Sequence, residues 1–317
     1  MEILSFGDEQ KLTNVEILNY YKQLKEYLIN TPHENITKGS LSICKTINPI
    51  VRHVLKRTCG YELIIDGNDK IKGLTGIYAH THQSKMDHVN LIASNPNHTI
   101  ILNSDILSKF YKMVLSINGV VYVNKFNKES KTKAKLEMMR LLLNDKSVTI
   151  FPESAWNLSP NKLHLPLYIG IVDIAKKTGK PIIPVVQEYY YDNYKLDGIE
   201  RIKKVHVVYG EPIFVNQLDN PFEKLEEYSN SISTIRWNLI DKNKTYKRSE
   251  ISNYEYINFL KGCIRNLKNA GIDINDENKG IYGSNDDFYL FHHINSIDYD
   301  NNGNLLPTEY VRKLRGN

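Results

Sequence analysis

The feature that most constrains the fold is a regular alternation of short apolar runs with helical patterns between residues 61 and 209. The apolar runs are continuous, as in strands that are buried on both faces. Helices between such strands are typical of a mostly parallel sheet with helices on both faces, so the sequence predicts an α/β fold. The expected strands are 61–65, 77–79, 99–102, 120–123, 148–151, 181–186 and 205–209, and the expected helices are 13–30, 47–59, a helix opening at 89, 104–116, 130–143, 167–177 and 221–241.

The sixth apolar run contains Pro181 and Pro184. A proline has no N–H to donate to a neighbouring strand, so it is confined to edge strands, strand starts and irregular positions. The sequence therefore predicts that this strand is distorted or lies at an edge of the sheet.

Composition narrows the class of protein. The chain has 317 residues, of which 41% are hydrophobic and 24% charged, as is ordinary for globular proteins. The net charge of +5 is compatible with an anionic membrane surface or anionic substrates and is too weak to indicate nucleic-acid binding. Cys44, Cys59 and Cys263 are odd in number and have no Cys-x-x-Cys spacing, which argues against a disulfide framework or a zinc site and fits a reducing cytoplasm.

Three segments are expected: an N-terminal helical segment (1–58), a main domain (59–243) and a small C-terminal appendage (244–317). No secretory signal pattern opens the chain and no window approaches eighteen apolar residues, so we expect a cytoplasmic protein that can lie peripherally on the inner membrane face. The helix 13–30 has one apolar stripe. It either packs on the main domain or lies on a membrane surface.

The stretch His80-Thr81-His82-Gln83-Ser84-Lys85-Met86-Asp87 lies between an expected strand and an expected helix. At such a turn His82 and Asp87 can meet. A carboxylate that binds one imidazole nitrogen fixes the tautomer and makes the other nitrogen a proton acceptor, which is the arrangement of an oriented general base. The alternative is that Asp87 only caps the following helix.

Two later stretches also follow expected strands. In Gly119-Val120-Val121-Tyr122-Val123-Asn124-Lys125 the strand ends at a cation, which either faces an anionic group or is simply solvated. In Phe151-Pro152-Glu153 the proline stops the strand and presents Glu153 at a defined place. That carboxylate either binds substrate hydroxyls or caps the next turn.

Taken in order, these stretches resemble four motifs of the glycerol-phosphate and lysophospholipid acyltransferase superfamily. His82, Ser84 and Asp87 match its His-x-Ser-x-x-Asp motif, often written HX4D. Residues 119–125 match the second motif with lysine in place of arginine, 151–153 match the start of Phe-Pro-Glu-Gly-Thr-Arg, and 182–185 match the apolar fourth motif around a proline. The stretch 210–213 resembles the end of the family domain, so the likeness covers roughly residues 61–213 and makes 59–243 an acyltransferase domain.

The resemblance implies transfer of a fatty acyl group from a thioester, acyl-CoA or acyl carrier protein, to a hydroxyl of a lysophospholipid, glycolipid or related lipid, with no bound cofactor and no metal. His82 would be the general base and Asp87 would orient it. Ser84, Lys125, Glu153 and Ser154 would contact substrates, with Glu153 at an acceptor hydroxyl and Lys125 in place of the phosphate-binding arginine of the family.

The sequence departs from the family at two cationic positions. Ser154-Ala155-Trp156 replaces Gly-Thr-Arg, and Lys125 replaces the other arginine. Lysine cannot make the bidentate phosphate contact of arginine, and Trp156 could instead stack on a sugar, contact an acyl chain or pack in the core. We therefore expect that plain lysophosphatidic acid is not the acceptor.

Two other functional hypotheses remain open at this point: a thioester hydrolase that uses the same pair on water, and a catalytically idle lipid-binding relative. A calcium-loop pattern also runs from Asp298 to Glu309, but Pro307 interrupts it. The Asn302-Gly303 pair within it is a strong hairpin signal, so a hairpin is favoured over a metal site.

Overall fold

The computed structural model describes residue 4, residues 6–31, residues 50, 53, 54 and 57, and residues 61–83, 86–97, 99–104, 119–123, 127–154, 157, 163–191 and 202–243. Its elements are α1 (Phe6–Glu9), α2 (Asn14–Asn30), β1 (Glu62–Asp66), β2 (Ile77–His80), α4 (Asp87–Ser94), β3 (Thr99–Ser104), β4 (Val120–Val123), α6 (Lys128–Leu143), β5 (Ser147–Ile150), α7 (Gly170–Thr178), β6 (Ile182–Tyr191), β7 (Ile202–Tyr209) and α8 (Pro221–Lys242).

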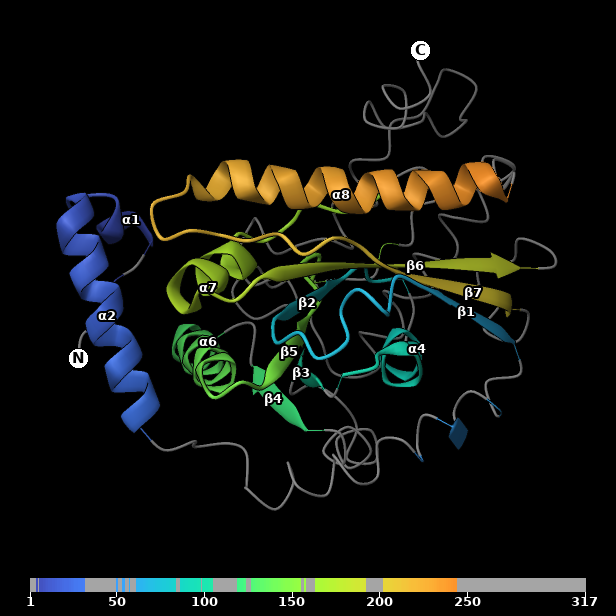
Figure 1. Cartoon of the computed structure of the whole chain (residues 1–317), viewed down its shortest axis with the longest axis horizontal. Helices are drawn as coiled ribbons and strands as arrows, with labels where there is room; N and C mark the ends of the chain where they lie inside the picture. The colour runs from blue at the N-terminus through green and yellow to red at the C-terminus, as the bar shows by residue number, and fades with distance from the viewer. Residues whose placement is uncertain are drawn as a thin grey trace, which may run out of the picture.

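One seven-stranded sheet, in the order β1-β7-β6-β2-β5-β3-β4, runs through the middle of the molecule (Figure 1). The strands from β6 to β4 pair in parallel, whereas β7 is antiparallel to β6 and β1 is parallel to β7. The predicted α/β fold with a mostly parallel sheet is confirmed. Because β2 and β5 are parallel neighbours, their carboxyl ends meet at the same edge of the sheet.

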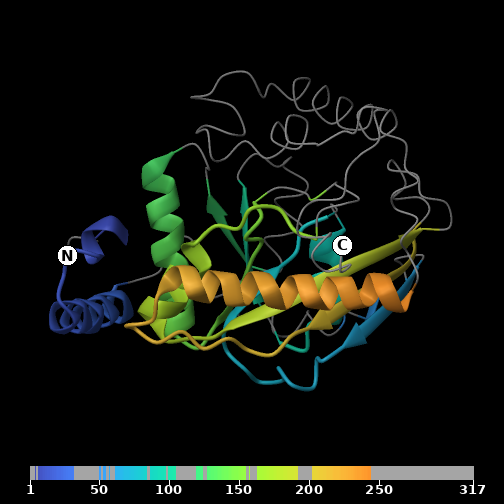
Figure 2. The same cartoon turned by 90° about the horizontal axis from the view of Figure 1, so that it is seen from above.

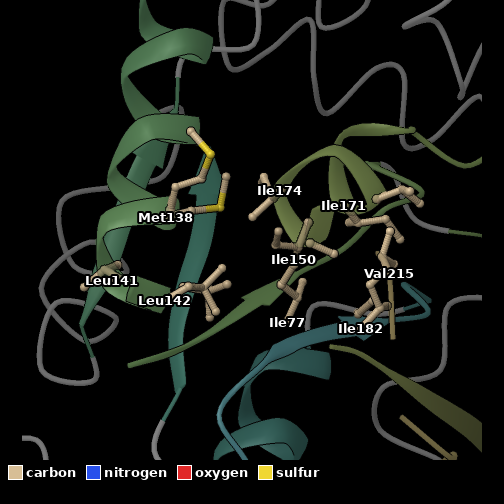
Figure 3. Packing of buried hydrophobic residues seen from close by; sticks show 14 of the residues in the cluster. Ile77, Met138, Leu141, Leu142, Ile150, Ile171, Ile174, Ile182 and Val215 are labelled. Carbon is tan, nitrogen blue, oxygen red and sulfur yellow. The ribbon is translucent and has the colours of Figure 1, made fainter. Parts of the chain in front are cut away.

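Helices cover both faces of the sheet. Helices α6 and α7 pack on one face, where apolar side chains of the strands meet those of the helices (Figure 3). The contacts there include Ile77, Ile150, Ile182, Met138, Leu142, Ile171 and Ile174. Helix α4 lies on the other face, where Leu91 packs with Ile101 and Val120. Coverage on both sides explains why the strands read as continuous apolar runs.

The predicted helix 13–30 is present as α2. Its start is fixed by a capping box in which Thr13 and Glu16 bond each other's backbone N–H groups. Its apolar stripe, which includes Tyr21 and Leu24, is buried in the core shared with α6 and α7, so the helix packs on the domain. Figures 1 and 2 both show α2 outside α6 and α7. Contact of its outer face with a membrane stays a prediction.

A buried ion cluster also ties the N-terminal helices to the sheet-covering helices. Lys177 on α7 pairs with Asp173 at 2.8 Å and with Glu9 on α1, and Tyr21 donates to Glu9 at 2.8 Å. Lys135 on α6 also pairs with Asp173. Mutual pairing makes the burial of these charges tolerable.

The sequence predicted that the Pro184 strand is distorted or lies at an edge, and the edge position is excluded because β6 lies between β2 and β7. Pro184 falls between the isolated bridge of Ile182 with Ile213 and the antiparallel ladder that starts at Val185. Its carbonyl accepts a hydrogen bond from the Gly210 N–H at 2.8 Å. Proline has no N–H, and at this position the chain that follows β7 forms no regular ladder with β6 that would need one. The interior strand therefore tolerates Pro184.

Several predicted features lie outside the described residues: most of the helix 47–59, the helix 104–116 except Ser104, and everything from residue 244 on, including the stretch from Asp298 to Glu309. Ser104 itself is the last residue of β3 and not the start of a helix. The three-segment division stays a prediction. Across the described part of the chain, no helix combines the length and apolarity that crossing a membrane requires.

Candidate active site

His82 and Asp87 meet at the carboxyl end of β2. The strand ends at His80, His82 follows two residues later, and Asp87 opens α4. The Nδ1 atom of His82 lies 2.7 Å from Oδ2 of Asp87. The imidazole is 13% exposed, whereas the carboxylate is fully buried. A hydrogen bond to a buried carboxylate holds the proton on Nδ1 and leaves Nε2 with the lone pair that a base needs.

The Asp87 carboxylate does not serve as the cap of α4. The N-cap residue is Met86, which makes no side-chain capping bond. Besides His82, the carboxylate accepts hydrogen bonds from the backbone N–H of Gln83 at 2.7 Å and from the hydroxyl of Tyr189 on β6. Of the two interpretations that the sequence left open for Asp87, the geometry supports the one in which it orients His82.

Phe151, at the end of β5, packs against three histidines. Its ring lies 4.2 Å from that of His82, with a tilt of 32°, and 4.8 Å from that of His88, with His80 close by. Burial lowers the pKa of His80 to about 3 and the pKa of His88 to about 4. Both are therefore neutral near pH 7, and neither places a positive charge beside His82.

Glu153 is fully buried and binds main-chain groups. Its Oε1 accepts from the N–H of His82 at 2.8 Å, and its Oε2 accepts from the N–H of Leu165 at 2.7 Å. Burial raises the pKa of Glu153 to about 7, although these two backbone bonds lower it. Contact of this carboxylate with an acceptor hydroxyl stays a prediction.

The segment after β5 therefore holds the main chain of His82 from both sides. Besides the bond from His82 N–H to Glu153, the N–H of Asn157 donates to the His82 carbonyl at 2.5 Å. Arg236 of α8 adds a further support, since it donates to the Gln83 side chain at 3.1 Å and to the Leu163 carbonyl at 2.6 Å. The Phe-Pro-Glu stretch thus positions the main chain of His82.

A second histidine–carboxylate pair shows that the pairing alone is not diagnostic. Nε2 of His206 on β7 lies 2.6 Å from Oδ2 of Asp66 on β1. That pair joins β1, which is an edge strand of the sheet, to its neighbour β7, and it lies away from β5 and from the segment that holds His82. What distinguishes the His82 pair is its place at the carboxyl ends of the central parallel strands, where α/β proteins bind ligands.

The remaining predicted site residues are only partly described. Ser154 follows Glu153 with its backbone in the left-handed region, at φ +57°, and its N–H donates to the Phe151 carbonyl at 2.9 Å. Ser84, Lys125 and Trp156 lie outside the described residues. Strand β4, which precedes Lys125, runs parallel to β2 and lies three strand spacings away, about 14 Å.

The sequence patterns did not predict the polar side chains that surround Asp87. Tyr189 and Gln187 belong to β6, which continues to Tyr191 although the sequence predicted an end at residue 186. Asn90 on α4 and Arg236 on α8 join the same region. The available signal was Gln187-Glu188 directly after an apolar run, since polar residues inside a buried strand need partners. Among the described residues, no group of three or more His, Cys, Asp or Glu side chains is placed to hold a metal ion.

Comparisons with known proteins agree with this architecture. Residues 62–188 match the family model described as Acyltransferase. A 1-acyl-sn-glycerol-3-phosphate acyltransferase of Borreliella burgdorferi is 28% identical over 193 residues, which are 59% of this chain and 74% of that protein. The crystal structure of the 1-acyl-sn-glycerophosphate (LPA) acyltransferase PlsC from Thermotoga maritima superposes with a TM-score of 0.50 at 18% identity, over 74% of this chain and 93% of that one, and supports the fold. The family-model match and the curated relative support the predicted likeness to the glycerol-phosphate and lysophospholipid acyltransferase superfamily, and with it an acyltransferase activity.

Proposed function

We propose that this enzyme transfers a fatty acyl group from a thioester donor to a hydroxyl of a lysophospholipid, with His82 as the general base. The observation that carries the proposal is the 2.7 Å contact between His82 Nδ1 and the buried Asp87 carboxylate at the carboxyl end of β2. The relative in Borreliella burgdorferi, named for acylation of 1-acyl-sn-glycerol-3-phosphate, supports the acceptor class.

In the proposed reaction, Nε2 of His82 takes the proton of the acceptor hydroxyl as the hydroxyl oxygen attacks the thioester carbonyl carbon. The tetrahedral intermediate then expels the thiolate, which takes the same proton from the imidazolium and leaves as a free thiol. The products are one ester and one thiol. Asp87 stabilises the imidazolium while it exists, and a positioned base of this kind contributes about 10²–10⁴-fold.

Several finer features belong to the proposal. The donor is an acyl-CoA or an acyl carrier protein, and no cofactor is bound. Ser84 and Lys125 are proposed substrate contacts, and with Lys125 and Trp156 at the arginine positions of the family we propose an acceptor other than plain lysophosphatidic acid. Peripheral contact of a cytoplasmic protein with the inner membrane face is likewise a proposal.

The direct test measures thiol released from palmitoyl-CoA, with and without a panel of lysophospholipids and glycolipids. Acceptor-dependent release supports transfer and identifies the acceptor. Release that needs no acceptor would point to a hydrolase, and no release with either palmitoyl-CoA or palmitoyl-carrier protein would point to an idle relative. Efficient acylation of lysophosphatidic acid, with Trp156→Arg adding little, would contradict the proposed acceptor.

Asp87→Asn tests the orienting role. The Gln83 N–H keeps the asparagine oxygen at the position of Oδ2, so the Nδ1–H of His82 retains its acceptor, but the negative charge that stabilises the imidazolium is lost. We expect kcat to fall about 10³–10⁴-fold. The circular dichroism spectrum should match that of the wild type, which would show that the fold is retained. His206→Asn, which disrupts the other histidine–carboxylate pair, is the matched control and should keep kcat within about twofold. Equal losses in both variants would contradict the assignment of the base.

A further inference from the structure

Behind Asp87, on the side away from His82, lies a set of buried hydrogen-bonded side chains. Oδ1 of Asp87 accepts from the hydroxyl of Tyr189, and both residues are essentially unexposed. The same hydroxyl is within 2.8 Å of Nδ2 of Asn90, whose Oδ1 accepts from the hydroxyl of Tyr61. The bond to Tyr189 therefore belongs to a connected chain of polar groups.

The direction of donation along this chain is fixed by a backbone carbonyl. Nε2 of Gln187 lies 3.2 Å from the Asp87 carbonyl, which can only accept, so this end of the Gln187 amide is the donor. Its Oε1 is then the acceptor for Nδ2 of Asn90, at 3.0 Å. Because Nδ2 of Asn90 can only donate, the Tyr189 oxygen accepts from it, and the hydroxyl hydrogen of Tyr189 is left for the Asp87 carboxylate.

We infer that Tyr189 is a positioning residue of the active site, whose hydroxyl holds Asp87 in the orientation and ionised state that His82 requires. This inference rests on the proposed function. Donors to the carboxylate include the imidazole and the Gln83 N–H on Oδ2, and Tyr189 on Oδ1. Removal of the hydroxyl takes a donor from Oδ1, which loosens the carboxylate and leaves more of its negative charge on the imidazole.

The two effects predict two separate changes in Tyr189→Phe, one in kcat and one in the pH dependence of activity. A looser carboxylate orients the imidazole poorly, so kcat falls. A carboxylate that no longer shares its charge with the phenol stabilises the imidazolium more, so the His82 base is protonated up to a higher pH. Hydrogen bonds to charged groups are among the stronger ones in proteins, and we expect kcat to fall about tenfold.

Strand β6 offers a matched control in the next residue. Tyr190 is also buried, but its hydroxyl points to the opposite face of the sheet, where it lies 2.9 Å from Nδ2 of Asn243 at the end of α8. Tyr190→Phe removes the same atom from the same strand without touching Asp87. It should leave kcat within about twofold of wild type.

Among the residues that the structure describes, the other titratable groups that face the pair include His80 on β2, His88 on α4, Glu153 after β5 and Arg236 on α8. The low pKa values of His80 and His88 keep both neutral above about pH 5. Arg236 stays charged throughout and is paired with Glu188 at 2.9 Å. Glu153, with a pKa of about 7, is the one of these four that changes charge near neutral pH, so Glu153→Gln is assayed in parallel.

The experiment measures the pH dependence of acceptor-dependent thiol release from palmitoyl-CoA for wild type, Tyr189→Phe, Tyr190→Phe and Glu153→Gln. We expect three results together in Tyr189→Phe and in no other variant. The kcat falls roughly tenfold, the KM for each substrate stays within about twofold, and the acidic limb of the pH–rate profile moves to higher pH. If Tyr189→Phe and Tyr190→Phe lose activity alike, without displacement of that limb, the hydroxyl is merely structural and the inference is wrong.

A second measurement does not depend on activity. The titration of His82 is followed by NMR of carbon-13-labelled histidine, with the resonance assigned by its loss in His82→Ala. Tyr189→Phe should raise the pKa of His82 and Tyr190→Phe should leave it unchanged. If no acceptor supports thiol release, the acyl-transfer proposal fails, and an unaltered His82 titration in Tyr189→Phe separately overturns the role of Tyr189.

Discussion

At the scale of single residues, the turn after β5 shows how a local backbone requirement supports the site. Glu153 can bind the main chain of His82 only because the chain reverses between Phe151 and Ser154, and Ser154 completes that turn at φ +57°. A side chain in the left-handed region is strained, whereas glycine is not. The family motif has glycine at this position, so the serine here retains the turn at a cost in free energy.

Ser154→Gly should therefore stabilise the protein. Relief of the left-handed strain contributes about 1–2 kcal/mol, and the greater freedom of glycine in the unfolded chain offsets part of it, which leaves a gain of about 0.5–1 kcal/mol. Urea unfolding measures the change. Ser154→Ala, which keeps the strain and removes only the hydroxyl, is the control, and a loss of stability in Ser154→Gly would contradict this account.

At the scale of elements, α7 begins and ends with glycines that have different roles. Gly179 is the C-cap and adopts φ +71°, and its N–H donates to the Ala175 carbonyl at 2.7 Å. Gly170 is the first helical residue, with no atom within 4 Å of the place where a Cβ would be. The predicted end of this helix at Gly179 is confirmed, because a left-handed glycine is the commonest way to stop a helix.

Alanine substitutions at the two ends of α7 should therefore have opposite effects. In Gly179→Ala the nearest atom to the new Cβ is Lys25 Nζ at 3.7 Å, so there is room and the cost is backbone strain alone, about 1–2 kcal/mol. In Gly170→Ala the helix gains up to about 0.5–1 kcal/mol. Thermal unfolding of the two variants checks the prediction, which fails if Gly179→Ala is as stable as wild type.

At the scale of the whole molecule, burial of the region around His82 couples stability to pH. His80 and His88 have folded pKa values of about 3 and 4, below the ordinary 6.5, so the unfolded chain binds more protons between these values. The stability that they contribute is complete above pH 6.5 and is lost as the pH falls toward 4. Glu153, whose pKa is raised from 4.5 to about 7, acts in the opposite sense, and its contribution is lost as the pH rises through 7.

Because two histidines oppose one glutamate, the free energy of unfolding should decrease between pH 7 and pH 4.5, by about 1–3 kcal/mol from these groups. Urea unfolding at several pH values measures this slope. His80→Phe removes one of the two histidines while keeping an aromatic ring beside Phe151, so its slope should be shallower, whatever its stability at pH 7. Parallel slopes for wild type and variant would show that His80 does not contribute.

The sequence by itself determined most of the strands and helices that the structure describes, and the loop that carries the proposed catalytic pair. These features are local: apolar periodicity defines each element, Thr13 and Gly179 mark helix ends, and His82 and Asp87 are close in the chain. The resemblance to the acyltransferase family drew on the same local motifs.

Only the tertiary structure decided how the site is supported. The pairing of β6 on both sides, the contact of Glu153 with the main chain of His82 and the contact of Tyr189 with Asp87 all join residues that are far apart in the chain. Sequence patterns report which face of an element is apolar, but not which distant polar group meets which. That depends on strand order and register, which are set by packing of the whole sheet.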